Sequence, residues 1–136
     1  MNLENYIEQQ IEWSKKTFGY GERDAGLIDH IKKELKGIEQ APGDIEEWID
    51  VIILALEGAW RNGYSPEEIT HMLVYKQIKN EKREWPDWRT AEQGKAIEHI
   101  RPTTCEICFG QGEIIGSDMR LNKCPGCSAP EKTSAF

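Results

Sequence analysis

The stretch 44-DIEEWIDVIILALEGAW-60 decides the fold. Most of its residues are apolar, and on a helix they would occupy nearly every side. Three carboxylates, Glu47, Asp50 and Glu57, interrupt it. A carboxylate in apolar surroundings is costly unless it is paired, hydrogen-bonded or bound to metal. Asp44 and Glu47 have the spacing of a capping box, which starts the helix at this point. The stretch therefore predicts a central buried helix whose acids need partners.

Further helices are expected around it, because apolar residues recur at spacings of three and four. They are predicted over residues 3–16, 23–39 and 66–84. Ser65 and Glu68 form a second capping box, with Pro66 at the first helical position. Pro86 ends the last helix, because proline disfavours the helical conformation in the residue before it. No strand is indicated before Cys105, so we expect an all-α fold.

Composition limits the kinds of partner. The chain has 136 residues with a net charge of −7, and this charge argues against broad binding to nucleic acid, which needs a basic surface. No apolar run reaches the length of a membrane span. The first residues lack the basic start and apolar stretch of a signal peptide. We therefore expect a cytoplasmic protein with neither a membrane nor a nucleic acid as partner.

The acids of the central helix suggest a metal site. Glu47 and Asp50 are three residues apart and share a helix face. A short connection makes the preceding helix an antiparallel neighbour, so Glu34 and Glu39 can face them. Converging carboxylates favour a divalent cation, and oxygen ligands suit Mg²⁺, with Mn²⁺ as a substitute. From spacing alone, however, a capping role for Glu47 or a solvated acidic face is the commoner interpretation.

Residues 13–101 resemble the dATP/dGTP diphosphohydrolase-type family of phages and prophages, within the MazG-like all-α nucleoside triphosphate pyrophosphohydrolases. The resemblance is carried by 29-DHIKKEL-35, 47-EWIDVIILALEGAWR-61 and 79-KNEKREWPDWR-89. It implies a metal-dependent enzyme of the host cytoplasm that cleaves a nucleoside triphosphate, and above all a purine deoxynucleotide, into a monophosphate and pyrophosphate. It also implies a homodimer or homotetramer, because a few helices alone do not close the core.

The superfamily's ligand pattern is E-E-x-x-E on one helix and E-x-x-D on the next. Glu47 and Asp50 match the second half and Glu34 matches the first, so the resemblance makes these three both metal ligands and catalytic residues. Lys33 and Gly37 stand where the other two acids are usual. Glu39 and Glu57 are candidate replacements. Otherwise the site has fewer protein ligands, or the protein is a catalytically weak nucleotide sensor.

The resemblance also suggests substrate contacts. On the helix predicted over residues 66–84, one face carries Lys76, Asn80 and Arg83, which would meet the triphosphate. The alternative is a solvated cationic face. The candidates for contact with the base are Trp13, Phe18 and His30. Core packing for Trp13 and a surface role for His30 stay open.

The segment 105-CEICFGQGEIIGSDMRLNKCPGC-127 has two Cys-x2-Cys pairs separated by fifteen residues. This spacing is typical of a structural zinc site, and its ligands would be Cys105, Cys108, Cys124 and Cys127. The first pair resembles a half-repeat of the cysteine-rich domain of J-type chaperones, which implies a zinc-ribbon-like hairpin. We expect a helical domain over 1–101, the zinc module over 102–130 and a tail over 131–136. An adaptor that works through its zinc module is a further alternative.

Overall fold

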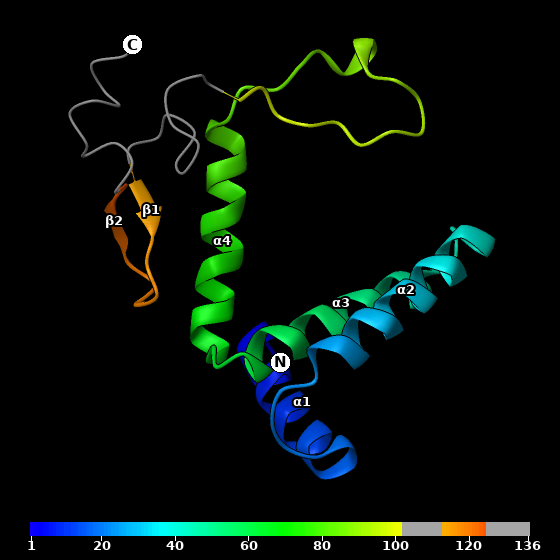
Figure 1. The fold of residues 1–136 in the computed structure, drawn as a ribbon, viewed down its shortest axis with the longest axis vertical. Helices are drawn as coiled ribbons and strands as arrows, with labels where there is room; N and C mark the ends of the chain where they lie inside the picture. Colours follow the sequence, from blue (N-terminus) through cyan, green and yellow to red (C-terminus); the bar gives the residue numbers. More distant parts are fainter. Residues whose placement is uncertain (102–112, 125–136) are drawn as a thin grey trace. The chain divides into compact units, whose positions relative to one another are not determined.

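The computed structural model describes residues 1–101 and 113–124. It contains four helices, a 3-10 turn and a short hairpin (Figure 1). The elements are α1 (Leu3–Phe18), α2 (Asp24–Gln40), α3 (Ile45–Arg61), α4 (Pro66–Lys82), η1 (Trp88–Thr90), β1 (Glu113–Ile115) and β2 (Leu121–Lys123). The expected all-α fold is confirmed, and the helix ends differ from the predicted ones by at most two residues.

The chain forms two compact units, Met1–Leu73 and Val74–Phe136. The expected domain boundary after residue 101 falls inside the second of these units. In the first unit, α2 and α3 lie side by side and α1 packs on α3 (Figure 1). The buried apolar side chains of this unit are Ile7, Leu27, Ile38, Leu54 and Trp60. This small core holds α2 and α3 together along the face that carries the acids.

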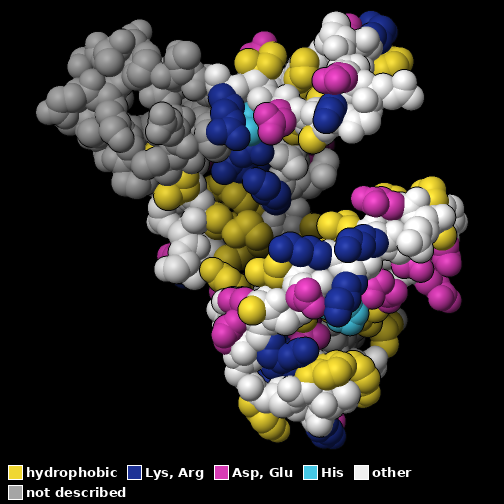
Figure 2. All heavy atoms as spheres, turned by 45° about the vertical axis from the view of Figure 1, so that its right-hand side comes forward, with side chains coloured by type: hydrophobic (Ala, Val, Ile, Leu, Met, Phe, Trp, Pro, Cys, Tyr) yellow, Lys and Arg dark blue, Asp and Glu magenta, His cyan; other side chains and the backbone are white. Residues whose placement is uncertain are grey.

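The prediction that α3 is buried on nearly every side is wrong for the single chain. Its buried residues are Leu54, Glu57 and Trp60, which lie on one face. Other apolar side chains of α3 are between 41% and 71% exposed, namely Ile45, Trp48, Ile49 and Ile52. Figure 2 shows hydrophobic side chains open to the surface among charged ones. The sequence pattern thus contains more apolar surface than one copy of the chain covers.

The two predicted helix starts have different outcomes. Ser65 and Glu68 form the expected capping box, with each backbone N–H donating to the other's side chain at 3.1 Å. Asp44 does cap α3, but its carboxylate accepts from the N–H of Glu46 at 3.0 Å. The Glu47 carboxylate lies instead against Gly37 of α2. Glu47 is therefore turned toward the neighbouring helix.

In the second unit, the segment that follows η1 is attached to the end of α4. The N–H of Ile100 donates to the carbonyl of Glu84 at 2.8 Å. The Trp85 ring packs edge-on against His99, and its indole N–H donates to the carbonyl of Asn80 at 2.7 Å. Trp85 thus holds this segment against the end of α4. No helix among the described residues is long and apolar enough to cross a membrane.

The hairpin pairs β1 and β2 antiparallel, with Glu113 opposite Lys123. Cys124 directly follows β2 and is fully buried. A hairpin here is what the zinc-ribbon resemblance predicts. The other three expected zinc ligands, Cys105, Cys108 and Cys127, lie outside the described residues, so zinc binding stays a prediction.

Candidate active site

Three of the predicted acids come together between α2 and α3. Glu34, Glu47 and Asp50 each place a carboxylate oxygen within 4.8 Å of the others. Glu34 and Glu47 are half-buried and Asp50 is exposed. An all-oxygen set that is open on one side fits Mg²⁺ or Mn²⁺, which keep water and phosphate oxygens among their ligands. The residues present therefore fit the metal that the resemblance implies.

The electrostatics of this cluster point the same way. Desolvation, and after it the charges of Glu34, Asp44, Asp50 and Glu46, raise the pKa of Glu47. A raised pKa means that the ionised carboxylate is insufficiently compensated by the surrounding protein. A divalent cation bound among Glu34, Glu47 and Asp50 would supply that compensation.

Gly37 makes room for one of these ligands. A Cβ built on Gly37 would collide with Oε2 of Glu47 and come within 3.1 Å of its Cδ. The space beside this position, where the superfamily pattern has an acid on α2, is thus taken by the Glu47 carboxylate from α3. Among the described residues, neither suggested replacement belongs to the cluster, and Glu57 pairs with arginines instead.

A cavity of about 250 Å³ adjoins the acids and is lined by both Glu34 and Asp50. Trp13 and Phe18 line it too, with their rings edge to face at 5.5 Å and each about half exposed. His30 also lines the cavity, and its Nε2 lies 3.0 Å from a Glu34 oxygen. The predicted base contacts thus border the same cavity as the acids, and His30 also holds a metal-ligand candidate in place.

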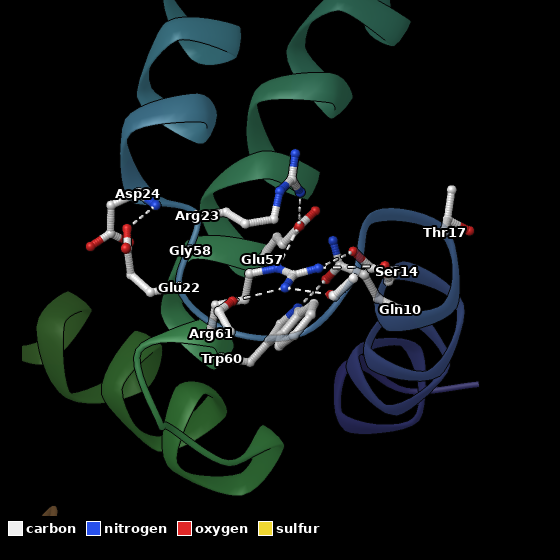
Figure 3. Close-up of polar contacts among 12 residues, drawn as sticks. Gln10, Ser14, Thr17, Glu22, Arg23, Asp24, Glu57, Gly58, Trp60 and Arg61 are labelled. Atoms are coloured by element: carbon white, nitrogen blue, oxygen red, sulfur yellow. Dashed lines mark hydrogen bonds and ion pairs between the residues drawn. The ribbon is translucent and has the colours of Figure 1, made fainter.

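A buried ion-pair network lies at this cavity (Figure 3). Oε2 of Glu57 accepts from Nε of Arg61 at 2.7 Å and from Nη1 of Arg23 at 2.6 Å. The remaining donors of Arg61 reach the carbonyls of Gly19, Gly21 and Ser14 and the Ser14 hydroxyl. Arg61 thereby ties the connection between α1 and α2 to the end of α3.

Sequence reasoning missed several of these residues. The i,i+4 spacing of Glu57 and Arg61 could have indicated an ion pair within an apolar helix. Nothing in the sequence indicated Gln10, which is buried, lines the cavity and donates to the carbonyl of Ile53 at 2.8 Å. Its Oε1 accepts from the Trp60 indole N–H at 3.2 Å, so both ends of the amide are fixed.

The predicted phosphate-binding side chains lie in the second unit, where Lys76 and Asn80 are on α4 and Arg83 directly follows its last residue. Asn80 and Arg83 contact each other, with Nη1 of Arg83 donating to Oδ1 of Asn80 at 2.9 Å. Lys76 lies one turn before Asn80 on the same helix face. Desolvation lowers the pKa of His99, and the positive charges of Arg83, Arg101 and Lys76 lower it further. Basic groups therefore gather at this end of α4, as a phosphate-binding role requires, and that role stays a prediction.

Comparison with known proteins identifies the family of the chain. A family model of dATP/dGTP pyrophosphohydrolase matches residues 6–103. The Eaa protein of Salmonella phage P22 is 34% identical over 121 residues, which cover 82% of this chain and 37% of the phage protein. The chain thus spans little more than a third of that relative's length. No solved structure matches the chain significantly. With most of its residues covered by the family model, the chain belongs to the dATP/dGTP pyrophosphohydrolase family.

Proposed function

We propose that the protein is a Mg²⁺-dependent nucleoside triphosphate pyrophosphohydrolase. It cleaves between the α and β phosphates, prefers purine deoxynucleotides, and releases a monophosphate and pyrophosphate. One observation carries the proposal: three carboxylates converge beside a cavity that also exposes two aromatic rings. Membership of the family supports the same class of reaction.

Each group in the first unit has a role in this proposal. Glu34, Glu47 and Asp50 hold the ion, which when bound supplies charge neutralisation for the phosphates and activation of a water molecule. His30 orients Glu34 through the contact between its Nε2 and a Glu34 oxygen at 3.0 Å. Groups hydrogen-bonded to metal ligands commonly have this role. The exposed rings of Trp13 and Phe18 offer flat surfaces on which a base stacks.

The proposed phosphate contacts come from Lys76, Asn80 and Arg83, at the end of α4 and directly after it. Lys76 and Arg83 carry the positive charge that a triphosphate needs, and Asn80 fixes the Arg83 guanidinium through a hydrogen bond. Arginine binds phosphate with two parallel N–H donors, and lysine acts as a point charge. We assign the three residues to the phosphates on this ground.

The test is a product assay on the purified protein with each canonical nucleoside triphosphate and Mg²⁺. We expect pyrophosphate and monophosphate in equal amounts, and a loss of roughly 100-fold or more in Glu47→Gln, because a charge that stabilises the transition state is removed. Glu46→Gln is the matched control, since Glu46 is the exposed neighbour outside the cluster. Release of inorganic phosphate in place of pyrophosphate would contradict the proposed cleavage position.

The alternative is a nucleotide sensor without turnover. It is favoured by the cluster having three carboxylates where the superfamily pattern has more, with Gly37 at one of the missing positions. A sensor would bind nucleotide with Mg²⁺ and release no pyrophosphate with either Mg²⁺ or Mn²⁺. Binding without product in the assay above would therefore favour the sensor over the enzyme.

A further inference from the structure

Arg23 has hydrogen-bonding capacity that the described part of the chain does not use. It lines the cavity with its side chain 30% exposed, and its guanidinium lies 4.8 Å from the centre of the Phe18 ring. A guanidinium has five N–H donors. Among the described residues, one of them is bonded, to Glu57.

Arg61 shows how different a purely structural arginine is in the same network (Figure 3). Its side chain is 1% exposed, and all five of its donors bond within the first unit. Glu57 therefore carries one negative charge between two guanidinium groups. Because Arg61 is closed off from the cavity, the excess positive charge is presented by Arg23.

The position of Arg23 in the cavity indicates which part of a ligand it meets. Its partner Glu57 lies seven residues along α3 from Asp50, and two helical turns span about 10 Å. A phosphate held by the acids would lie at the opposite end of the cavity from Arg23. Arg23 instead lies beside the Phe18 ring, which in turn packs edge to face against Trp13, and bases stack on aromatic rings of this kind. The unused donors therefore face the place of a base.

The chemistry of the two purines then separates them. Guanine offers two adjacent acceptors, N7 and O6, whereas adenine offers N7 beside the N6 donor. The planar fork of arginine matches two adjacent acceptors. We propose that Arg23 reads the N7–O6 edge of guanine and so makes the enzyme prefer dGTP to dATP. This inference rests on the proposed function for the placement of the nucleotide.

The test compares dGTP with 7-deaza-dGTP, which lacks the N7 acceptor, in the wild type and in Arg23→Lys. The lysine variant keeps the charge beside Glu57 and loses the fork. Since a bidentate contact discriminates by about 1–3 kcal/mol, we expect kcat/KM of the wild type to favour dGTP by roughly 5- to 160-fold. In Arg23→Lys the ratio should fall toward one. Arg23→Gln should also give a ratio of dGTP to 7-deaza-dGTP near one, and its melting temperature shows whether the variant is folded.

Binding is measured beside turnover so that two failures can be told apart. The ratio of Kd values for dGMP and 7-deaza-dGMP tests Arg23 whether or not pyrophosphate is released. An intact Kd ratio without product would overturn the proposed hydrolysis and leave the reading of guanine supported. If Arg23→Lys weakens the binding of dGTP, 7-deaza-dGTP and inorganic tripolyphosphate equally, Arg23 binds phosphate and the inference is wrong. A wild-type ratio of one would also overturn it.

Discussion

At the scale of single residues, Gly37 has the most unusual environment in the site. Gly37→Ala should make the helix more favourable by about 1 kcal/mol, because glycine is a poor helix former. The new methyl group would nevertheless displace the Glu47 carboxylate, whose Cδ lies 3.1 Å from the added Cβ position. We therefore expect Mg²⁺ affinity and pyrophosphate release to fall at least tenfold while the melting temperature stays level or rises.

Gly26→Ala is the matched control for this prediction. It lies in the same helix, and a Cβ at Gly26 would meet nothing within 4 Å. It should leave Mg²⁺ binding unchanged. Equal loss of Mg²⁺ affinity in both variants would show that the effect comes from the helix backbone and not from Glu47.

At the scale of elements, Arg61 connects α1, the turn before α2 and α3. Arg61→Met should lower the free energy of unfolding by about 3–5 kcal/mol, because the variant leaves the buried Ser14 hydroxyl and half of an ion-pair network without their partner. Urea unfolding followed by circular dichroism measures this. The control is Lys16→Gln, which removes a pair at 3.3 Å whose side chains are both more than 70% exposed. That pair should contribute less than about 1 kcal/mol.

The elements themselves were largely predictable. Periodicity and capping residues located all four helices, and the Ser65–Glu68 box formed as expected. The acids came together because the short connection between α2 and α3 leaves their helices few arrangements. The contacts that Glu57 and Gln10 make beside the cavity were not predictable in this way. Glu57 meets Arg23 and Gln10 meets Trp60 across 34 and 50 residues, and such pairings depend on packing and not on local pattern.

At the scale of the whole molecule, the exposed apolar face of α3 predicts a second copy of the chain as its partner. Ile45, Trp48, Ile49 and Ile52 repeat at helical spacing and are exposed. Contiguous apolar surface of this kind marks interaction sites. We expect sedimentation to show a dimer or tetramer, and Ile52→Glu to give monomers, with Glu46→Gln as the control on the same helix. A monomeric wild type would contradict this.

Zinc binding belongs to the same scale. Four thiolates should hold one zinc ion per chain, and this metal would supply most of the folding free energy of so short a segment. Elemental analysis should find one zinc in the wild type and a loss in Cys124→Ser. Pyrophosphate release should persist in that variant, because neither the acids nor the proposed phosphate-binding residues belong to the cysteine segment. If pyrophosphate release and bound zinc are lost together, the zinc module takes part in catalysis.

The ion pair between Arg23 and Glu57 has a consequence for how relatives of this protein can diverge. One helix, α3, carries two of the three acids, Glu47 and Asp50, together with the anchor of Arg23, so the spacing between the two ends of the cavity is inherited with that helix. Inserting one residue between Asp50 and Glu57 would turn the anchor by about 100° and carry it off the cavity. Changes in base preference are therefore expected to arise by exchange of side chains at positions such as 23. Insertions and deletions should be confined to the connections outside α3.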